Sequence, residues 1–181
     1  MAYEISRVLI TEEQIRQRVR EMGEKITQDY CNKDLFIVSI LKGSVIFLSD
    51  LIRNISLPVQ LDFMAVSSYG TSTATSGVVR ILKDLESDII SKDILIVEDI
   101  VDTGLTLSYL KESLYARNPA SLKTCALLDK PDRRRVPMVP DYIGYEIPDE
   151  FVVGYGLDCD EEFRNLPYIG VLKDYIKDKN R

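Results

Sequence analysis

The fold of this chain is decided by residues 94–106, which read Ile94-Leu95-Ile96-Val97-Glu98-Asp99-Ile100-Val101-Asp102-Thr103-Gly104-Leu105-Thr106. The stretch starts with four aliphatic residues, a pattern typical of a strand that is buried on both faces of a sheet. A polar turn follows, and residues 105–118 are predicted to form a helix. Because unpaired backbone N–H groups and the helix dipole both point into such a turn, the stretch predicts an anion site between strand and helix.

The carboxylates in this stretch place a second requirement on the ligand. Glu98 and Asp99 would repel a phosphate alone, but carboxylates accept hydrogen bonds from sugar hydroxyls and bind divalent cations. Gly104 allows close approach of the backbone to a phosphate, and the hydroxyls of Thr103 and Thr106 add donors. We therefore expect a sugar-phosphate site with an acidic edge. The alternative is a buried strand that merely ends in a polar turn.

Composition limits the classes of function. The chain has 181 residues, a net charge of −6 and no histidine. A single domain with a sizeable core fits this length, and the acidic balance argues mildly against nucleic acid as the main partner. The lack of histidine excludes His-based triads and His metal sites. With no apolar run long enough for a membrane span, no signal-peptide pattern and three cysteines without metal-type spacing, we expect a cytoplasmic protein that has no membrane partner.

The rest of the chain alternates between strand and helix patterns. A strand is predicted at residues 5–10, and a capping box at residues 11–14 opens a helix that runs to about residue 30, with a purely structural role. Residues 35–41 form a buried strand, and residues 42–44 turn it into a helix over 45–54. This second strand–turn–helix unit is either another anion cradle or a solvated turn that happens to carry a lysine.

Further strands are predicted at residues 59–67, 78–82 and 121–128. The small, polar stretch at residues 68–77 is either a disordered hairpin tip or a lid that closes over the site, and we favour the lid. Lys130 follows the last of these strands, at the edge where doubly wound sheets place their ligands. The run of arginines at residues 133–135 is interpreted as a solvated loop, with a subunit contact or a regulatory anion site as the alternatives.

The central stretch resembles the 5-phosphoribosyl-1-pyrophosphate (PRPP) motif of the type I phosphoribosyltransferases: four aliphatics, two acids, two aliphatics, then Asp-Thr-Gly-x-Thr. The resemblance implies an α/β fold with a central, mostly parallel twisted sheet flanked by helices. It also implies a small hood made from the N- and C-terminal segments. We expect a single domain over residues 1–181, with a core at about 11–150 and the hood from about 1–10 and 151–181.

A second resemblance lies in the C-terminal part of the chain, at residues 146–158 (Glu-Ile-Pro-Asp-Glu-Phe-Val-Val-Gly-Tyr-Gly-Leu-Asp) and 163–172. These runs are similar to the hypoxanthine-guanine phosphoribosyltransferases, and with them the resemblance covers nearly the whole chain in order. It implies purine salvage by Mg²⁺-dependent transfer of the phosphoribosyl group from PRPP to hypoxanthine or guanine. The expected partners are a 6-oxopurine, PRPP and further copies of the chain in a homodimer or homotetramer.

The resemblance also implies roles for individual residues. Asp102 would be the catalytic base. Purine binding would involve Lys130, Phe151, Val152 and Asp158, magnesium would be held at Glu98, Asp99 and Asp158, and the root of the lid would be Ser68 and Tyr69. The peptide bond between the residues matching Leu41 and Lys42 can be cis in the family. Residues expected to bind PRPP or its phosphates are Leu41, Lys42, Gly43, Glu98, Asp99, Asp102, Thr103, Gly104, Leu105, Thr106 and Arg164.

Two other functions remain open at this point. One is a relative that prefers xanthine, and the other is a PRPP-sensing regulatory protein of the same fold. The sequence leaves open the order of preference among the 6-oxopurines, the size of the oligomer, regulation by guanosine tetraphosphate, and the roles of Cys159 and residues 133–135. Cys159 and the run Glu161-Glu162-Phe163 depart from residues frequent in the family, and we expect these departures to affect the packing of the hood.

Overall fold

The structure is a computed structural model that describes residues 3–68 and 79–173. Ser68 ends a strand, whereas Tyr69 and the remainder of the expected lid lie outside the described residues. The elements are β1 (Ile5–Ile10), α1 (Glu12–Asp29), β2 (Leu35–Leu41), α2 (Val45–Arg53), β3 (Gln60–Ser68), β4 (Val79–Lys83), β5 (Asp93–Val101), α3 (Leu105–Tyr115), β6 (Ser121–Asp129), the 3-10 helix η1 (Pro131–Arg133), β7 (Tyr142–Glu146), β8 (Val152–Val153) and β9 (Ile169–Leu172).

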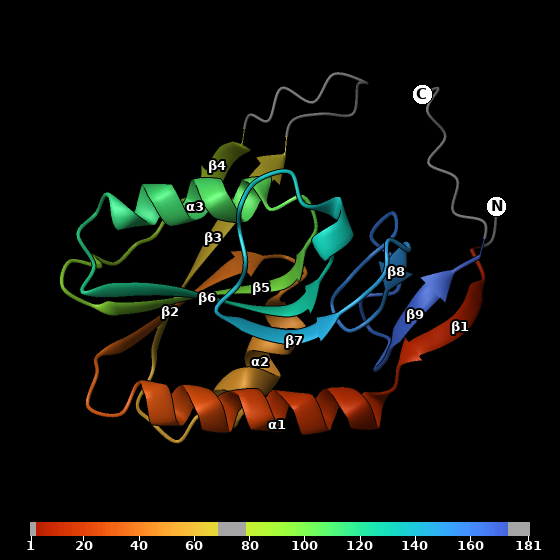
Figure 1. Cartoon of the computed structure of the whole chain (residues 1–181), viewed down its shortest axis with the longest axis horizontal. Helices are drawn as coiled ribbons and strands as arrows, with labels where there is room; N and C mark the ends of the chain where they lie inside the picture. The colour runs from red at the N-terminus through yellow and green to blue at the C-terminus, as the bar shows by residue number, and fades with distance from the viewer. Residues whose placement is uncertain (1–2, 69–78, 174–181) are drawn as a thin grey trace.

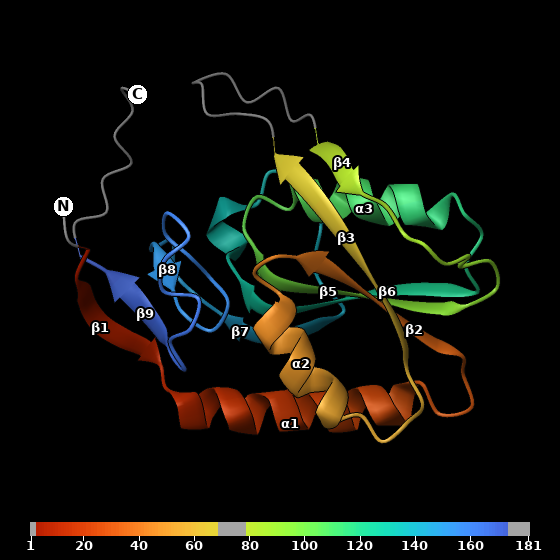
Figure 2. The same cartoon turned by 180° about the vertical axis from the view of Figure 1, so that it is seen from behind.

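The larger of two sheets has the strand order β4-β3-β2-β5-β6-β7. Its strands pair in parallel except for β4, which runs antiparallel to β3 at one edge. The helix α3 covers one face of this sheet, and α1 and α2 cover the other (Figures 1 and 2). The predicted α/β fold is therefore confirmed.

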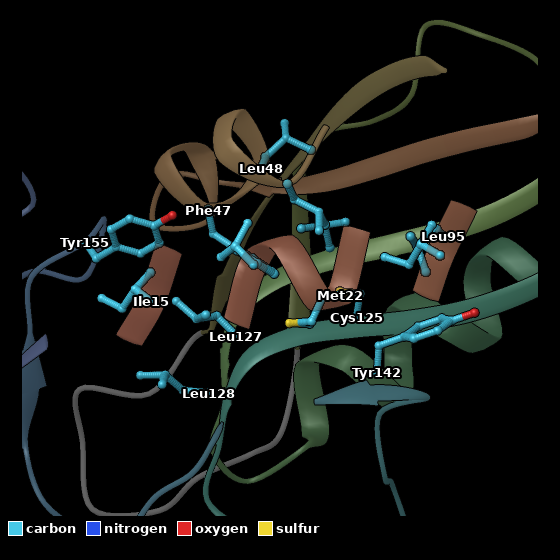
Figure 3. Packing of buried hydrophobic residues seen from close by; sticks show 14 of the residues in the cluster. Ile15, Met22, Phe47, Leu48, Leu95, Cys125, Leu127, Leu128, Tyr142 and Tyr155 are labelled. Atoms are coloured by element: carbon cyan, nitrogen blue, oxygen red, sulfur yellow. The ribbon is translucent and has the colours of Figure 1, made fainter. Parts of the chain in front are cut away.

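The central strand β5 shows why this sheet is buried on both faces. Leu95 and Val97 point into a cluster that α1 and α2 complete, and Ile94 and Ile96 point into the cluster that contains the apolar side of α3. Figure 3 shows the first cluster, in which Met22 of α1 lies against the sheet. Because helices cover both faces of the sheet, side chains on either face of β5 are buried. A strand made of consecutive aliphatic residues is therefore stable here, with no need for polar residues at alternate positions.

The smaller sheet has the order β1-β9-β8 and is antiparallel. Its strands come from the two ends of the chain, so that Ile5 pairs with Leu172 and Val152 pairs with Val171. Figure 1 shows this sheet beyond the carboxyl end of β7. It therefore lies at the end of the larger sheet where α/β proteins bind their ligands.

The first helix starts as predicted. The backbone N–H of Gln14 donates to Thr11 Oγ1 at 3.3 Å, and the backbone N–H of Thr11 donates to Gln14 Oε1 at 2.9 Å. This reciprocal pair is a complete capping box, which occupies donors at the helix start that would otherwise lack partners.

The edge strand β7 was not predicted from the sequence, and it is held in place by α1. Arg18 Nε donates to the carbonyl oxygen of Gly144 at 2.8 Å, and Arg18 Nη2 donates to that of Ile143 at 3.1 Å. One long side chain thus connects the helix to two carbonyl groups of the edge strand.

Within the described residues, no helix is both long and apolar enough to cross a membrane. Cys31, Cys125 and Cys159 all carry free thiols, of which only that of Cys31 is exposed.

Candidate active site

The turn between β5 and α3 forms the first half of the site. Gly104 has a φ of +80°, in the left-handed region that glycine adopts without strain, and it lies just before the first residue of α3. No side chain caps the start of α3. A cavity of about 110 Å³ lies at this turn. Its lining residues are Glu98, Ile100, Val101, Asp102, Thr103, Gly104, Thr106 and Leu107.

The turn between β2 and α2 likewise joins a buried strand to a helix whose N-cap side chain does not cap it. Ser44 precedes the helix, but its hydroxyl donates back to the carbonyl oxygen of Ile40 at 2.5 Å and hydrogen-bonds Ser39 Oγ at 2.8 Å. No side chain caps the start of α2 either. The peptide bond joining Leu41 and Lys42 is cis, as the family resemblance implied. Neither N-cap residue, Ser44 or Gly104, caps its helix with a side chain, in contrast to Thr11 at α1, although Thr103 Oγ1 accepts a long hydrogen bond of 3.4 Å from the backbone N–H of Leu105.

The α2 turn touches the end of β5. A Cβ atom built on Gly43 would lie 1.7 Å from Asp99 Oδ2, so a larger residue at position 43 would require the Asp99 carboxylate to move. The expected pyrophosphate loop therefore lies directly beside the acidic pair at the end of β5.

Glu98 and Asp99, the acidic pair, lie in an environment that disfavours their charged forms. Burial, followed by the negative charge of Asp99, raises the pKa of Glu98 well above its usual value. Burial raises the pKa of Asp99 to about 6, although the backbone N–H of Ile100 and the positive charge of Arg164 lower it. Ligand hydroxyls or a bound cation would relieve both carboxylates, because each would favour the charged form.

The described residues contain no cluster of three or more acidic, Cys or His side chains arranged to hold a metal ion. Asp158 lies close enough to Asp99 for its charge to help raise the pKa of that residue. Magnesium is usually bound by one or two carboxylates together with substrate phosphates and water. The separate carboxylates here fit that mode of binding, and they do not form a complete protein cage.

Hood residues reach the site from above the α2 turn. Arg164 Nη1 donates to the carbonyl oxygen of Gly156 at 2.9 Å, and Arg164 Nη2 lies 2.9 Å from Asp158 Oδ1. A Cβ on Gly156 would lie 2.0 Å from the carbonyl oxygen of Gly43, so the hood loop rests directly on the expected pyrophosphate loop. Glu161 joins the two loops, since its carboxylate pairs with both Arg164 and Lys42.

The expected purine residues lie at the end of β6 and in the hood. Lys130 is buried, and its ammonium group donates to the carbonyl oxygen of Glu150 at 2.7 Å. Burial lowers the pKa of Lys130, against the charges of Asp102 and Asp149, which raise it. Phe151 is half-buried against the small hood cluster. The side chain of Val152 packs into the main core, so that only its backbone remains for ligand contact.

The interpretation of residues 133–135 as a solvated loop is wrong for Arg134. Its guanidinium is largely buried, pairs with the buried carboxylate of Asp129 and donates to the carbonyl oxygen of Asp102 at 2.9 Å. Arg133 Nε donates to Asp102 Oδ1 at 3.0 Å. The first two arginines of the run therefore hold the turn that carries the expected catalytic base.

The structure thus gathers the residues expected to bind PRPP around the two turns, with Arg164 and Asp158 above them. The backbone N–H of Lys130 donates to the carbonyl oxygen of Val101 at 2.9 Å, next to the α3 turn, and the charge of Asp102 acts on the ammonium group of Lys130. Sequence reasoning missed Ser39, Arg134 and Glu161. Of these, only Ser39 left a signal in the sequence, as a polar residue within an otherwise apolar strand.

Comparison with known proteins places the chain in a family. Residues 9–160 match the model of the phosphoribosyl transferase domain. The chain is 54% identical over 175 residues to a hypoxanthine-guanine phosphoribosyltransferase of Mycobacterium tuberculosis, covering 93% of this chain and 87% of the relative. It is 50% identical over 176 residues to the Bacillus subtilis protein of that name, covering 97% and 98%.

A solved structure gives the same result for the fold. The crystal structure of a hypoxanthine phosphoribosyltransferase from Staphylococcus aureus superposes with a TM-score of 0.90 at 52% identity, covering 93% of this chain and 92% of the other. Family model, sequence relatives and fold agree over most of the chain, so this protein belongs to the phosphoribosyltransferase family, in the group of the hypoxanthine-guanine phosphoribosyltransferases.

Proposed function

We propose that this chain transfers the 5-phosphoribosyl group of PRPP to N9 of hypoxanthine or guanine, giving IMP or GMP and pyrophosphate. The observation that supports this most is the pair of helix starts without capping side chains, α2 and α3, with Glu98 and Asp99 between them. A ligand that carries a phosphate at one end of a hydroxylated sugar and a pyrophosphate at the other matches such a site. The names of the relatives supply the base.

In this proposal each turn binds one end of PRPP. The α3 turn, with the hydroxyls of Thr103 and Thr106, surrounds the 5-phosphate through its backbone N–H groups. The α2 turn holds the pyrophosphate through Lys42 and the backbone of Gly43, with Arg164 reaching it from the hood. Opposite helix starts thereby fix the sugar so that its C1 atom is presented to the purine.

The purine lies toward Lys130. The buried ammonium group has three donors and no acceptor, so it suits a 6-oxo oxygen and disfavours a 6-amino group. Phe151 would stack on the ring, and the backbone of Val152 would contact its edge. A hypoxanthine or guanine ring would thus be accepted and adenine rejected.

Magnesium would be held by Glu98, Asp99 and Asp158, partly through water, together with oxygens of PRPP. When bound, it neutralises charge on the pyrophosphate as it leaves. Lys42 and Arg164 stabilise the same charge from the protein side.

The proposed reaction breaks the bond between C1 and the pyrophosphate oxygen and forms the bond between C1 and N9. The purine gives up its N7 proton, and Asp102 accepts it. Arg133 Nε lies 3.0 Å from Asp102 Oδ1 and so holds the carboxylate in position. The pyrophosphate carries away the electron pair of the broken bond.

The first experiment measures conversion of PRPP with hypoxanthine, guanine, xanthine and adenine, each with magnesium and with excess chelator. We expect magnesium-dependent formation of IMP and GMP, with adenine inert. Higher turnover with xanthine than with the other bases would make the chain a xanthine-preferring relative. Tight PRPP binding without turnover of any base would contradict the proposal and leave a PRPP-sensing protein.

The Asp102→Asn variant tests the base. We expect turnover to fall by about a hundredfold or more, the usual contribution of a general base, with a much smaller change in PRPP affinity. The matched control is Asp132→Asn, which removes one exposed carboxylate beside Arg133 and should leave turnover unchanged. Equal losses of turnover and affinity in Asp102→Asn would instead give the residue a structural role in the turn.

We also propose a cytoplasmic location and a homodimer or homotetramer. Sedimentation of the purified chain over a range of concentrations measures the oligomer directly, and a monomer at all concentrations would contradict this part of the proposal.

A further inference from the structure

The expected pyrophosphate site already contains an anionic group of the protein. Glu161 Oε1 lies 3.0 Å from Lys42 Nζ, and Glu161 Oε2 lies 3.0 Å from Arg164 Nη2. Its carboxylate therefore bridges the same two cations that are assigned to the pyrophosphate. The bridge joins loops that are 119 residues apart in the chain.

Arg164 does not depend on this bridge for its position. Its guanidinium is already held by the carbonyl oxygen of Gly156 and by the carboxylate of Asp158. Arg164 Nε is buried and has no hydrogen-bond partner among the described residues. A buried donor without an acceptor is costly, and here it belongs to a side chain that faces an anion site.

Lys42 is in the opposite situation. Its side chain is 68% exposed, and within the described part of the chain its ammonium group pairs only with Glu161. The side chain of Glu161 is itself 64% exposed, so it can move into solvent at little cost. The cation positions are thus defined by the turn and the hood loop, whereas the anion between them is displaceable.

The backbone of the hood loop holds Glu161 near these cations. Asp160, Glu161 and Phe163 all have positive φ angles, and the backbone N–H of Glu161 donates to Asp158 Oδ2 at 3.0 Å. L-residues pay a steric cost in this region, so the loop keeps its conformation only through such contacts.

We infer that Glu161 takes the place of the pyrophosphate group between Lys42 and Arg164 in the free protein, and that PRPP or pyrophosphate must displace it on binding. The inference rests on the proposed pyrophosphate role of Lys42 and Arg164. It makes Glu161 a residue that weakens pyrophosphate binding and promotes its release, by pairing again with both cations as the product leaves.

The test is the affinity for inorganic pyrophosphate of the whole chain, measured by calorimetry at fixed magnesium. Glu161→Gln keeps the length of the side chain and removes its charge. We expect it to bind pyrophosphate about fivefold more tightly, since two exposed ion pairs no longer compete with the ligand. The KM for PRPP should fall in parallel, and the gain should shrink as salt is added, because salt screens exposed pairs.

The matched control is Glu162→Gln, which makes the same change of charge one residue along the loop. Glu162 is exposed, and no ion pair joins it to Lys42 or Arg164. A fivefold gain in Glu161→Gln with little change in Glu162→Gln supports the inference. Equal gains in both variants would assign the effect to net charge and overturn it, and unchanged or weaker binding in Glu161→Gln would also overturn it.

A third variant separates this inference from the proposed function. Arg164→Gln should weaken pyrophosphate binding. If it does so while Glu161→Gln has no effect, the bridge is only a surface contact and the inference alone fails. If Arg164→Gln leaves pyrophosphate binding unchanged, the assignment of the pyrophosphate site is wrong and the inference falls with it.

Discussion

Asp62 and Glu98 are two buried carboxylates in neighbouring parts of the larger sheet, and each is 8% exposed. Their pKa values nevertheless shift in opposite directions, downward for Asp62 and upward for Glu98. Burial disfavours the charged form of both carboxylates and is the largest single influence on the pKa of each. The two differ in what acts beside it: hydrogen-bond donors offset burial at Asp62, whereas the negative charge of Asp99 adds to it at Glu98.

Asp62 is fully provided with donors. Burial alone would raise its pKa, but backbone N–H groups and an ammonium group together lower it. The donors are the backbone N–H groups of Phe63, Glu86 and Ser87 at 2.7 to 3.1 Å, and Lys83 Nζ at 3.4 Å. Such a carboxylate fixes the segment after β4 to the sheet, and it has no need of a ligand.

Glu98 has none of these donors. Its carboxylate accepts no hydrogen bond from the residues that the structure describes, and Asp99 lies beside it. The same contrast distinguishes the capped start of α1 from the starts of α2 and α3. Polar groups that the fold satisfies internally stabilise this protein, and those that it leaves unsatisfied are gathered where a ligand would bind.

Asp62→Asn should produce the largest change in stability. We expect the free energy of unfolding to fall by about 2 kcal/mol at pH 7, because three backbone donors lose a charged acceptor. Because the pKa of Asp62 is lower in the folded than in the unfolded protein, its ionised carboxylate stabilises the fold. This stabilisation is complete above the pKa of an unfolded Asp, about 3.9, and it is lost as the pH falls through the pKa of Asp62 in the folded protein. Urea titrations at pH 7 and pH 3 should show a smaller gap between wild type and variant at the lower pH.

Glu98→Gln should have the opposite sign. Its raised pKa means that ionisation costs stability increasingly as the pH rises above about 4.3, the pKa of an unfolded Glu. The variant lacks this cost, so we expect it to be more stable by about 1 kcal/mol at pH 7, with turnover reduced. Thermal unfolding across pH 4 to 8 checks this, and a variant less stable than wild type at pH 8 would contradict it.

Lys83→Met should have the smallest effect. Lys83 is partly exposed and contributes less to the lowered pKa of Asp62 than the three backbone N–H groups do. We expect only a small fall in the free energy of unfolding, because water screens the charge of this lysine. NMR titration of Asp62 in this variant should still give a pKa below the usual value, whereas a normal value would assign the shift to the lysine.

Much of the fold could be predicted from sequence because its local patterns and its tertiary structure agree. The aliphatic run at residues 94–97 needs cover on both faces, and strand–helix alternation supplies that cover. The strand β7 was missed, because Tyr142–Glu146 alternates only briefly and its pairing depends on distant β6. The helix α3 ends at Tyr115 instead of Asn118, where the backbone has turned to a φ of +56°.

The candidate site was less accessible to sequence reasoning. The turns could be located because they lie within contiguous motifs. Nothing in a run of three arginines indicates that Arg134 would be buried against Asp129, and nothing near Glu161 indicates that it would reach Lys42. In both contacts the two residues come close to each other only when the chain has folded.

The two hydrogen bonds from Arg18 to the carbonyl groups of Ile143 and Gly144 have a consequence for assembly. Edge strands with open carbonyl groups recruit strands from other molecules, which leads to sheet extension and aggregation. Because neighbouring carbonyl groups of a strand point to opposite sides, the guanidinium occupies one acceptor on the open side of β7 that an incoming strand would use. Extension of the sheet by a second copy of the chain at β7 is therefore disfavoured.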